Sequence, residues 1–272
     1  MIPRAHITAW RSQAPWPTDA QVEQDLLLTR ALIEIFKPSA IAGAVAFRGG
    51  TALHKLYFEH PGRYSEDIDL VQIEAGPIGN LLDAIRERLD PWLGEPRRRR
   101  GPGRVTIVYR FDTTLEPSQK MRLKIEINSR EHFSVRGMQK RRLTVNSPWF
   151  SDSANITVYG LEELLGTKLR ALYQRKKGRD LYDLWRVLDT KDLKDESIIE
   201  GFDRYIAHGG QKVTRAQFEE NLANKMQDNA FLEDVVPLLP TEVTYQVQTA
   251  YELVSSRLVA LLPGDPWKGT AS

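Results

Sequence analysis

The stretch from residue 46 to residue 71, AFRGGTALHKLYFEHPGRYSEDIDLV, constrains the fold of this chain more than any other. A short apolar strand breaks at a double glycine, a brief helical pattern follows, and a second strand carries Asp67 and Asp69. Because residues two apart on a strand point to the same face, these carboxylates project together. Adjacent carboxylates repel each other unless a cation lies between them, and oxygen ligands suit Mg²⁺ or Mn²⁺. We therefore predict a metal site at these two aspartates.

The double glycine, Gly49-Gly50, stands directly before the helical pattern. Glycine lets backbone amides approach a phosphate closely, and the dipole at a helix N-terminus favours anions. Paired glycines also form simple tight turns, and Thr51 could serve only as a helix cap. The chain has neither the Walker P-loop nor the three spaced glycines of the dinucleotide fingerprint. A phosphate cradle and a plain turn both remain open from the residues alone.

The sequence before residue 160 mixes helical and strand patterns. Thr18 and Gln21 predict a capping box at the start of a helix that ends at Pro38. Alternating apolar and polar residues predict neighbouring strands at 105–111 and 121–129, and shorter strands at 143–145 and 156–158. The arginines at 97–100, followed by Gly-Pro-Gly, are interpreted as a basic turn.

From Leu161 onward the apolar pattern takes the helical period of 3.6 residues. Five helices are expected, at residues 161–176, 179–189, 195–207, 214–227 and 241–262. We therefore predict an α+β protein, with a mixed sheet and flanking helices over residues 1–160 and an all-helical half over residues 161–272.

Three charged residues outside the opening stretch are further candidates for a site. Glu126 lies on the polar face of its strand, which alone indicates a solvent-facing edge, but it could act as ligand or base if that strand lies beside the Asp67 strand. Lys168 falls within the apolar stripe of its helix, so either an anion faces it or its ammonium snorkels to solvent. Asp180 suits a helix N-terminus, whereas Asp183 lies near an apolar side.

Composition limits the class of protein and its partners. The chain has 41% hydrophobic and 27% charged residues, no cysteine and a net charge of +2. No apolar run approaches the ~18 residues that cross a bilayer, so we expect a cytoplasmic protein without a membrane partner. The basic residues are clustered, at 97–100, 120–124, 140–142 and 175–177, which leaves RNA or DNA as a partner. Zinc and serine hydrolase motifs are missing from the sequence.

Taken in order, FRGGTALHKLYF, RYSEDIDLV, LKIEINS, LEELLGTKLRAL and GRDLYDLW closely resemble the AbiEii/AbiGii toxin family of nucleotidyltransferases, which includes the MenT toxins. The resemblance covers roughly residues 1 to 190. It implies a polymerase-beta-like nucleotidyltransferase fold whose helical half completes the active site. It also implies a toxin of a bacterial toxin–antitoxin or phage-defence pair, a nucleoside triphosphate substrate and a cognate AbiEi-like antitoxin. Better understood relatives add nucleotides to the 3′ end of tRNA, which stops translation.

The resemblance also implies roles for individual residues. Asp67 and Asp69 would carry the divalent metals, Mg²⁺ or Mn²⁺. Gly49, Gly50 and Thr51 would hold the triphosphate, with Ser65 beside the metal strand. Lys168 would contact the nucleotide phosphates. Asp183 would be the essential late carboxylate, and Glu126 matches the third acid of the family. Whether Glu126 and Asp180 take part directly stays open.

Three hypotheses follow from the residues and the resemblance together. The first is metal-dependent transfer of a nucleoside monophosphate to RNA, with tRNA as the first choice. The second is the same transfer onto a protein or a small molecule. The third is a non-catalytic nucleotide-binding partner in a regulatory complex.

Overall fold

The computed structural model describes residues 2–114 and 117–269. The chain forms two compact units, of which the first ends at Tyr159 and the second begins at Gly160. Within the described ranges, no helix is both long and apolar enough to cross a membrane.

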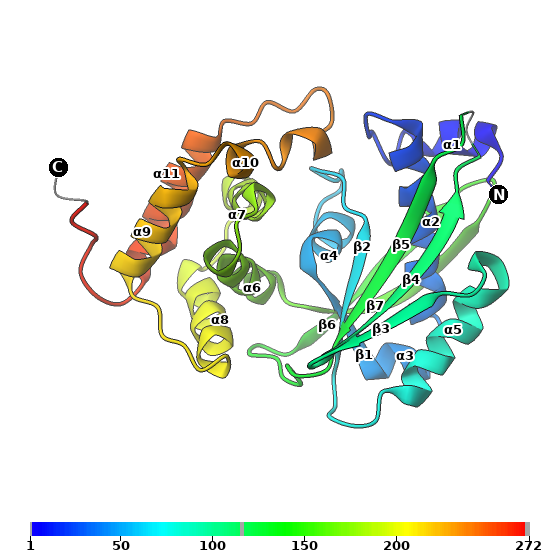
Figure 1. Ribbon diagram of the computed structural model, residues 1–272, viewed down its shortest axis with the longest axis horizontal. Coiled ribbons are helices and arrows are strands. Elements are labelled where there is room, and N and C mark those ends of the chain that lie inside the picture. The colour runs from blue at the N-terminus through cyan, green and yellow to red at the C-terminus, as the bar shows by residue number, and fades with distance from the viewer. Residues whose placement is uncertain (1, 115–116, 270–272) are drawn as a thin grey trace. The chain divides into compact units, whose positions relative to one another are not determined.

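The first unit contains one mixed sheet with helices beside it (Figure 1). Its helices are α1 (Arg4–Trp10), α2 (Asp19–Phe36), α3 (Ser39–Ala44), α4 (Gly49–Leu56) and α5 (Gly79–Leu93). Its strands are β1 (Val45–Arg48), β2 (Asp67–Gln72), β3 (Arg97–Gly101), β4 (Arg104–Asp112), β5 (Lys120–Asn128), β6 (Met138–Asn146) and β7 (Ser151–Tyr159). In the described residues the strands run in the order β3-β4-β5-β2-β1-β7-β6, with β2–β5 and β1–β7 parallel and the other pairs antiparallel. The predicted mixed sheet is confirmed.

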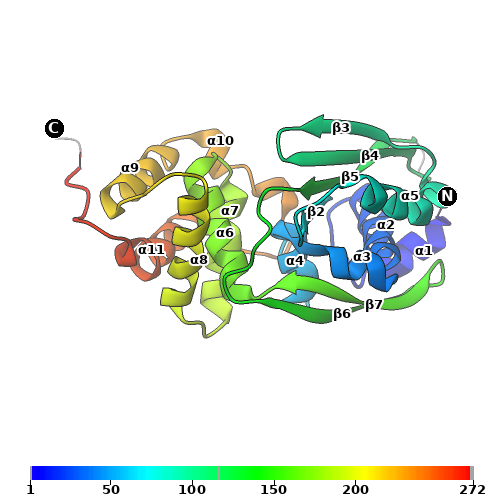
Figure 2. The ribbon, with the colours of Figure 1, turned by 90° about the horizontal axis from the view of Figure 1, so that it is seen from below.

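The two faces of β4 and β5 differ because their apolar residues alternate with polar ones. Ile107, Tyr109 and Ile125 are fully buried, and this face packs against α2 and α5 (Figure 2). The Tyr109 hydroxyl donates a hydrogen bond of 2.7 Å to Asp90 Oδ1 of α5. The charged residues of β5 therefore lie on the opposite face of the sheet from these helices.

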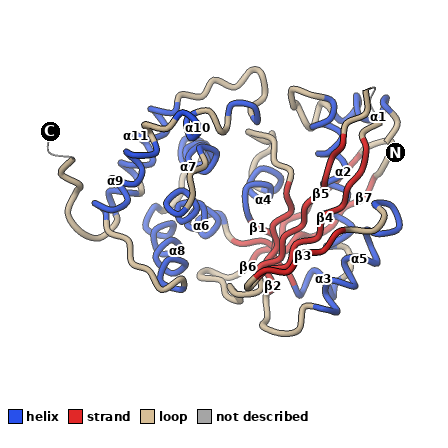
Figure 3. The backbone as a smooth tube through the Cα atoms, in the orientation of Figure 1, coloured by secondary structure: helices blue, strands red, loops and turns tan. Residues whose placement is uncertain are grey.

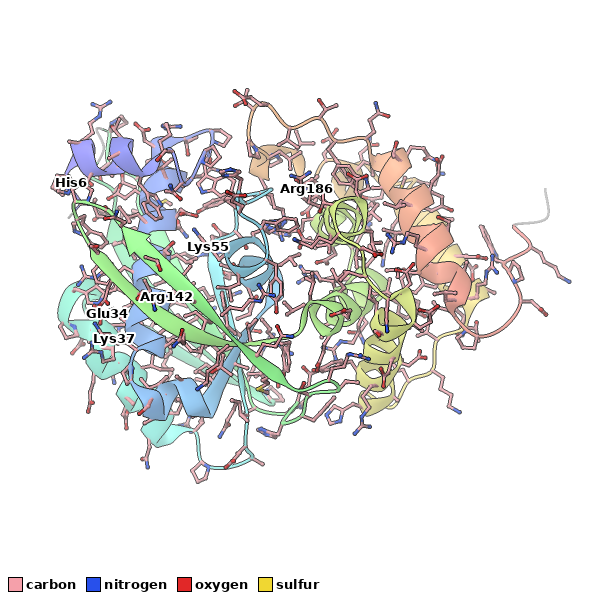
Figure 4. The ribbon with its side chains drawn as sticks, turned by 180° about the vertical axis from the view of Figure 1, so that it is seen from behind. His6, Glu34, Lys37, Lys55, Arg142 and Arg186 are labelled. Atoms are coloured by element: carbon pink, nitrogen blue, oxygen red, sulfur yellow. The ribbon has the colours of Figure 1, made fainter. Side chains whose placement is uncertain are left out.

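The predicted capping box of α2 is confirmed, since the Thr18 hydroxyl accepts from the Gln21 amide and the Gln21 side chain accepts from the Thr18 amide. Further along α2, the buried carboxylate of Asp25 accepts hydrogen bonds from the indoles of Trp10 (2.8 Å) and Trp16 (3.1 Å). A third donor is Lys55 of α4, labelled in Figure 4, whose ammonium lies 2.7 Å from both carboxylate oxygens. One buried anion thus fastens the N-terminal segment and α4 to α2.

Two sequence interpretations need correction. The arginines at 97–100 do not form a turn, because they make up the edge strand β3 and pair with β4; the turn itself follows at 102–103. Four consecutive charges conceal the alternation that would reveal a strand, and an edge strand tolerates them because solvent reaches it. The strands expected at 143–145 and 156–158 are each part of a longer, nine-residue strand, β6 and β7, and lie in its C-terminal half.

The second unit is helical, and the strands of Figure 3 all belong to the first. It comprises α6 (Leu161–Gln174), α7 (Gly178–Thr190), α8 (Asp195–His208), α9 (Arg215–Lys225), α10 (Asn229–Leu232), the 3₁₀ turn η1 (Val236–Leu238), α11 (Val247–Arg257) and the 3₁₀ turn η2 (Val259–Leu261). The helix expected at 241–262 is thus shorter. A Cβ added to Gly166 of α6 would lie 2.8 Å from backbone atoms of Ile198 and Phe202 on α8, so these helices are in close backbone contact.

Candidate active site

Parallel pairing of β2 with β5 aligns the predicted acids on one face of the sheet. Asp69 lies opposite Glu126, and Asp67 lies opposite Lys124. Residues directly opposite each other on paired strands share a face, so all four side chains project together, whereas Ile68 and its partner Ile125 are buried on the other face. The Glu126 strand lies beside the Asp67 strand, which is the condition under which Glu126 could act as a ligand or a base. The solvent-facing edge interpretation of Glu126 is wrong, because β5 lies inside the sheet.

The charge of Asp69 is poorly compensated. Burial raises the pKa of this carboxyl above its ordinary value, and the neighbouring carboxylates of Asp67 and Glu126 raise it further, against the opposing effects of Arg48 and Lys124. Three acids on adjacent positions therefore repel one another, which is the electrostatic setting of a cation site.

Lys124 supplies the positive charge in this structure. Its ammonium lies 2.8 Å from Asp67 Oδ2 and 4.0 Å from Glu126 Oε2. Burial lowers the pKa of Lys124, but the hydrogen bond and charge of Asp67, with smaller effects of Asp69 and Glu126, outweigh burial and raise it. Lys124 is a residue that sequence reasoning missed, although its place in the alternating LKIEIN pattern put it on the acid face.

Gly49 ends β1, begins α4 and touches the acid cluster. Its φ of +81° belongs to the left-handed region that favours glycine. A Cβ at this position would lie 2.4 Å from Asp69 Oδ2, because β1 pairs with β2 so that Arg48 is opposite Asp69. The first amides of α4 have no partner inside the helix, so the N-terminus of α4 combines free donors with a favourable dipole beside the acids. This geometry favours the phosphate cradle over the plain turn.

Replacement of Gly49 with alanine is expected to lower the free energy of unfolding by about 1–3 kcal/mol, the usual cost of a left-handed non-glycine residue. It should also lower kcat/KM for nucleotidyl transfer by on the order of 10²-fold, because the new methyl group displaces the Asp69 carboxylate. Urea denaturation and steady-state kinetics measure the two effects. The matched control is Gly43→Ala, where a Cβ meets nothing within 4 Å. Equal behaviour of both variants would contradict this role of Gly49.

Thr51 and Ser65 join α4 to the acid strand. The Thr51 hydroxyl donates to the backbone carbonyl of Asp67 at 2.6 Å and lies 2.7 Å from the Ser65 hydroxyl, which therefore donates to it. Thr51 is 1% exposed and does not cap α4, whose N-cap is Arg48 without a side-chain cap bond. The cap interpretation of Thr51 is wrong, and its contacts hold the glycine amides in place beside the acids.

Arg48 is a second residue that sequence reasoning missed. Its guanidinium pairs with the buried Glu131, and Asn128 donates to the same Glu131 oxygen at 3.4 Å. Burial lowers the pKa of Arg48, but the nearby negative charges outweigh this effect and raise the pKa. The largest of these contributions comes from Glu131 and a smaller one from Asp69. A permanent cation thus lies at the junction of β1 and α4.

In the second unit, Lys168 lies inside a buried charge network. Its ammonium is 2.9 Å from Asp180 Oδ1 and 2.7 Å from Asp183 Oδ2, and both aspartates are fully buried. Arg175 donates to both oxygens of Asp180, at 2.6 and 2.7 Å. Burial raises the pKa of Asp180, but Lys168 and Arg175 outweigh it and lower the pKa. The anions that face Lys168 therefore belong to α7 of the same unit, and Lys168 does not snorkel.

The predicted residues fall into two groups, one in each unit. In the first unit, Gly49, Asp67, Asp69 and Glu126 come together, with Gly50, Thr51 and Ser65 at the adjoining start of α4 and β2. In the second unit, Lys168, Asp180 and Asp183 come together. The assignment of Lys168 and Asp183 to the nucleotide stays a prediction.

Other solved structures share this fold. The structure of MenT4, a nucleotidyltransferase toxin from Mycobacterium tuberculosis, is similar with a TM-score of 0.68 and 16% identity over 97% of this chain and 91% of MenT4. JHP933 from Helicobacter pylori is similar with a TM-score of 0.52 and 19% identity over 87% of this chain and 89% of that protein. These similarities define the fold. A search of curated proteins found no match.

The family model described as "Nucleotidyl transferase AbiEii toxin, Type IV TA system" matches residues 30–253. The chain belongs to this AbiEii family. It is a nucleotidyltransferase toxin of a toxin–antitoxin system, so its substrate is a nucleoside triphosphate and its counterpart is an antitoxin.

Proposed function

We propose that this toxin transfers a nucleoside monophosphate from a nucleoside triphosphate to RNA, with the 3′ end of tRNA as the acceptor, and that a divalent metal assists. The observation that carries the proposal is the alignment of Asp67, Asp69 and Glu126 on one face of the sheet beside the glycine-led start of α4. The tRNA acceptor and a role in phage defence come from the family resemblance, and the exposed arginines at 97–100 support an RNA partner.

The donor set fits Mg²⁺ or Mn²⁺. All three candidate ligands are carboxylates, which hard divalent cations prefer, and the raised pKa of Asp69 marks negative charge without sufficient compensation. Among residues 2–114 and 117–269, no three acidic or histidine side chains already converge on one point. Lys124 instead contacts Asp67, so its ammonium competes with a metal for that carboxylate.

In the proposed reaction, the terminal hydroxyl of the acceptor forms a bond to the α-phosphorus and the bond to pyrophosphate breaks. Asp67 and Asp69 would hold the divalent cation, which when bound would neutralise charge on the phosphates and acidify the hydroxyl. Glu126 lies beside Asp69 and accepts the proton of the hydroxyl. The amides of Gly49 and Gly50 stabilise the negative charge of the departing pyrophosphate. The Thr51 hydroxyl donates a hydrogen bond to the backbone carbonyl of Asp67 and so keeps these amides beside the acid strand.

The proposal is tested by incubation of the protein with Mg²⁺ and each α-labelled nucleoside triphosphate. Separate reactions contain tRNA, total protein and small metabolites as acceptors. We expect label in tRNA only, with its loss after chelation by EDTA and its return with added Mg²⁺. Label in protein or in a metabolite would overturn the RNA acceptor, and transfer that survives EDTA would overturn the metal.

Replacement of Lys124 with methionine is expected to raise the affinity of the protein for Mn²⁺ about tenfold, because a competing charge near the carboxylates is removed. Free Mn²⁺ is followed by electron paramagnetic resonance during titration. Lys120→Met is the matched control, since Lys120 is exposed on the same strand and is aligned with Asp112 rather than with the acid cluster. Unchanged or weaker Mn²⁺ binding by Lys124→Met would show that Lys124 does not compete with the metal.

A further inference from the structure

The face of β3, β4 and β5 that carries Glu126 is strongly basic. Strand register places seven cations on it, which we call the basic face: Arg97 and Arg99 of β3, Arg104 and Arg110 of β4, and Lys120, Arg122 and Lys124 of β5. The acids among the residues of these three strands on this face are Glu126 and Asp112. A groove of ≈ 360 Å³ runs over the face and is lined by six of the seven cations together with Glu126.

Most of this charge is not compensated within the protein. In the described part of the chain, no carboxylate lies within ion-pair distance of Arg97, Arg99, Arg110 or Arg122, whereas Arg104 is 3.9 Å from Glu126. Arg110 and Arg122 are directly opposite each other on β4 and β5. Like charges at directly opposed positions destabilise a sheet. The arrangement therefore indicates an external anion rather than a contribution to stability.

The basic face leads into the acid cluster. One row across the sheet reads Arg99, Thr106, Glu126 and Asp69, and the next reads Arg97, Val108, Lys124 and Asp67. Neighbouring strands are ~4.8 Å apart, so about 14 Å separates the edge strand from the aspartates. That span corresponds to about four nucleotides at the ~3.4 Å rise of a stacked strand.

The chemistry of the face selects a phosphate backbone rather than bases. Five of its seven cations are arginines, whose planar guanidinium groups bind phosphate oxygens in pairs. Gly101, Thr106 and Val108 lie between the cations on this face. None of the residues that β3, β4 and β5 place on this face is aromatic. Without aromatic platforms the face cannot stack bases, so it cannot bind single strands through them.

We propose that the basic face holds the phosphates of the last nucleotides of the RNA acceptor, with the strand running from β3 towards β2 and its terminal hydroxyl at Asp69 and Glu126. This inference rests on the proposed RNA acceptor. It adds where the RNA strand binds, in which direction the strand runs, and that binding does not depend on the RNA sequence. Phosphate contacts fix register and carry no sequence information.

The test is Arg97→Gln together with Arg99→Gln, because both residues are exposed on the edge strand and lie away from the acids. Fluorescence anisotropy measures the Kd for a labelled single-stranded RNA at several KCl concentrations, without nucleoside triphosphate. We expect Kd to rise by at least tenfold and the slope of log Kd against log salt to fall by about 1.4, since each single-strand phosphate contact contributes about 0.7. RNAs of different sequence should be affected equally.

The matched control is Lys140→Gln with Arg142→Gln, which removes two exposed charges from β6 at the opposite edge of the sheet. Thermal melting checks that both double variants fold. Equal losses of RNA affinity in both, or no loss in the Arg97/Arg99 variant, would overturn the proposal. Unchanged RNA binding with weakened binding of the antitoxin would assign the face to a protein and would also overturn it. RNA binding is measured separately from nucleotidyl transfer. If the wild-type protein bound RNA on the basic face but transferred label only to protein, the proposed function would be refuted and the inference about the basic face would stand.

Discussion

Replacement of Asp67 with alanine is expected to abolish growth inhibition and to lower the rate of nucleotidyl transfer by on the order of 10³-fold or more. Asp67 belongs to the proposed cation site, where preorganised charge would stabilise the developing charges of the reaction. The side chain is 32% exposed, so its loss should leave the fold intact. Growth after induced expression and single-turnover transfer by the purified variant measure the two effects, and thermal melting checks the fold.

The control for this variant is Asp83→Ala, because Asp83 is exposed on α5, on the helix-covered side of the sheet. It should remain as toxic as the unmodified protein. Asp67→Asn separates charge from shape, and we expect it to fail as Asp67→Ala does, since the amide keeps the volume but cannot neutralise a divalent cation. Full toxicity of either Asp67 variant would refute the proposed site.

A large effect on stability is expected from Gly166→Ala in the helical unit. A Cβ at this position would lie 2.8 Å from the Ile198 carbonyl oxygen and the Phe202 amide nitrogen, and 2.9 Å from the Gly201 carbonyl carbon. These are backbone atoms of α8, so α6 and α8 must separate to make room. Overpacking of this kind costs about 1–3 kcal/mol in the free energy of unfolding. Urea denaturation followed by circular dichroism measures the loss.

Gly201→Ala is a matched control from the same helix contact. Its Cβ would approach the α-carbons of Glu163 and Gly166 at 3.6 Å, an ordinary van der Waals distance. Alanine is the better helix former, so this variant should be as stable as the unmodified protein or slightly more stable. If Gly166→Ala were equally stable, the close backbone contact would not limit how these helices pack.

The sequence was most informative where polar residues break an apolar pattern. Asp67 and Asp69 interrupt a strand, and Glu126 alternates with isoleucines, so strand geometry alone set their common face. The adjacency of the two strands could not be derived from either pattern, because it depends on pairing across more than fifty residues. The alternating pattern made Glu126 a candidate, the family resemblance supported it, and the parallel register of β2 and β5 places it beside Asp69.

Charges without a visible period were the main source of error. Arg97–Arg100 form a strand although no residue among them is apolar, since pairing with β4 alone fixes their extended backbone. For Lys168 the sequence leaves an anion and snorkelling to solvent as alternatives, and the structure shows anions, namely Asp180 and Asp183 of the next helix. In the sequence, the helix N-terminus alone accounts for Asp180. A sequence shows that a buried lysine needs a partner and does not show whether that partner is a ligand or the protein.

The parallel pairing of β1 with β7 has a consequence for the timing of synthesis. Phe47 pairs with Val158, so β1 lacks its second neighbour until almost the whole first unit has been made. Such distant contacts form only after a long loop has been closed. At a translation rate of about 5–20 residues per second, roughly 4 to 18 seconds separate Asp69 from Val158. The nascent toxin therefore carries its acids on an incomplete sheet until the ribosome has nearly finished the first unit.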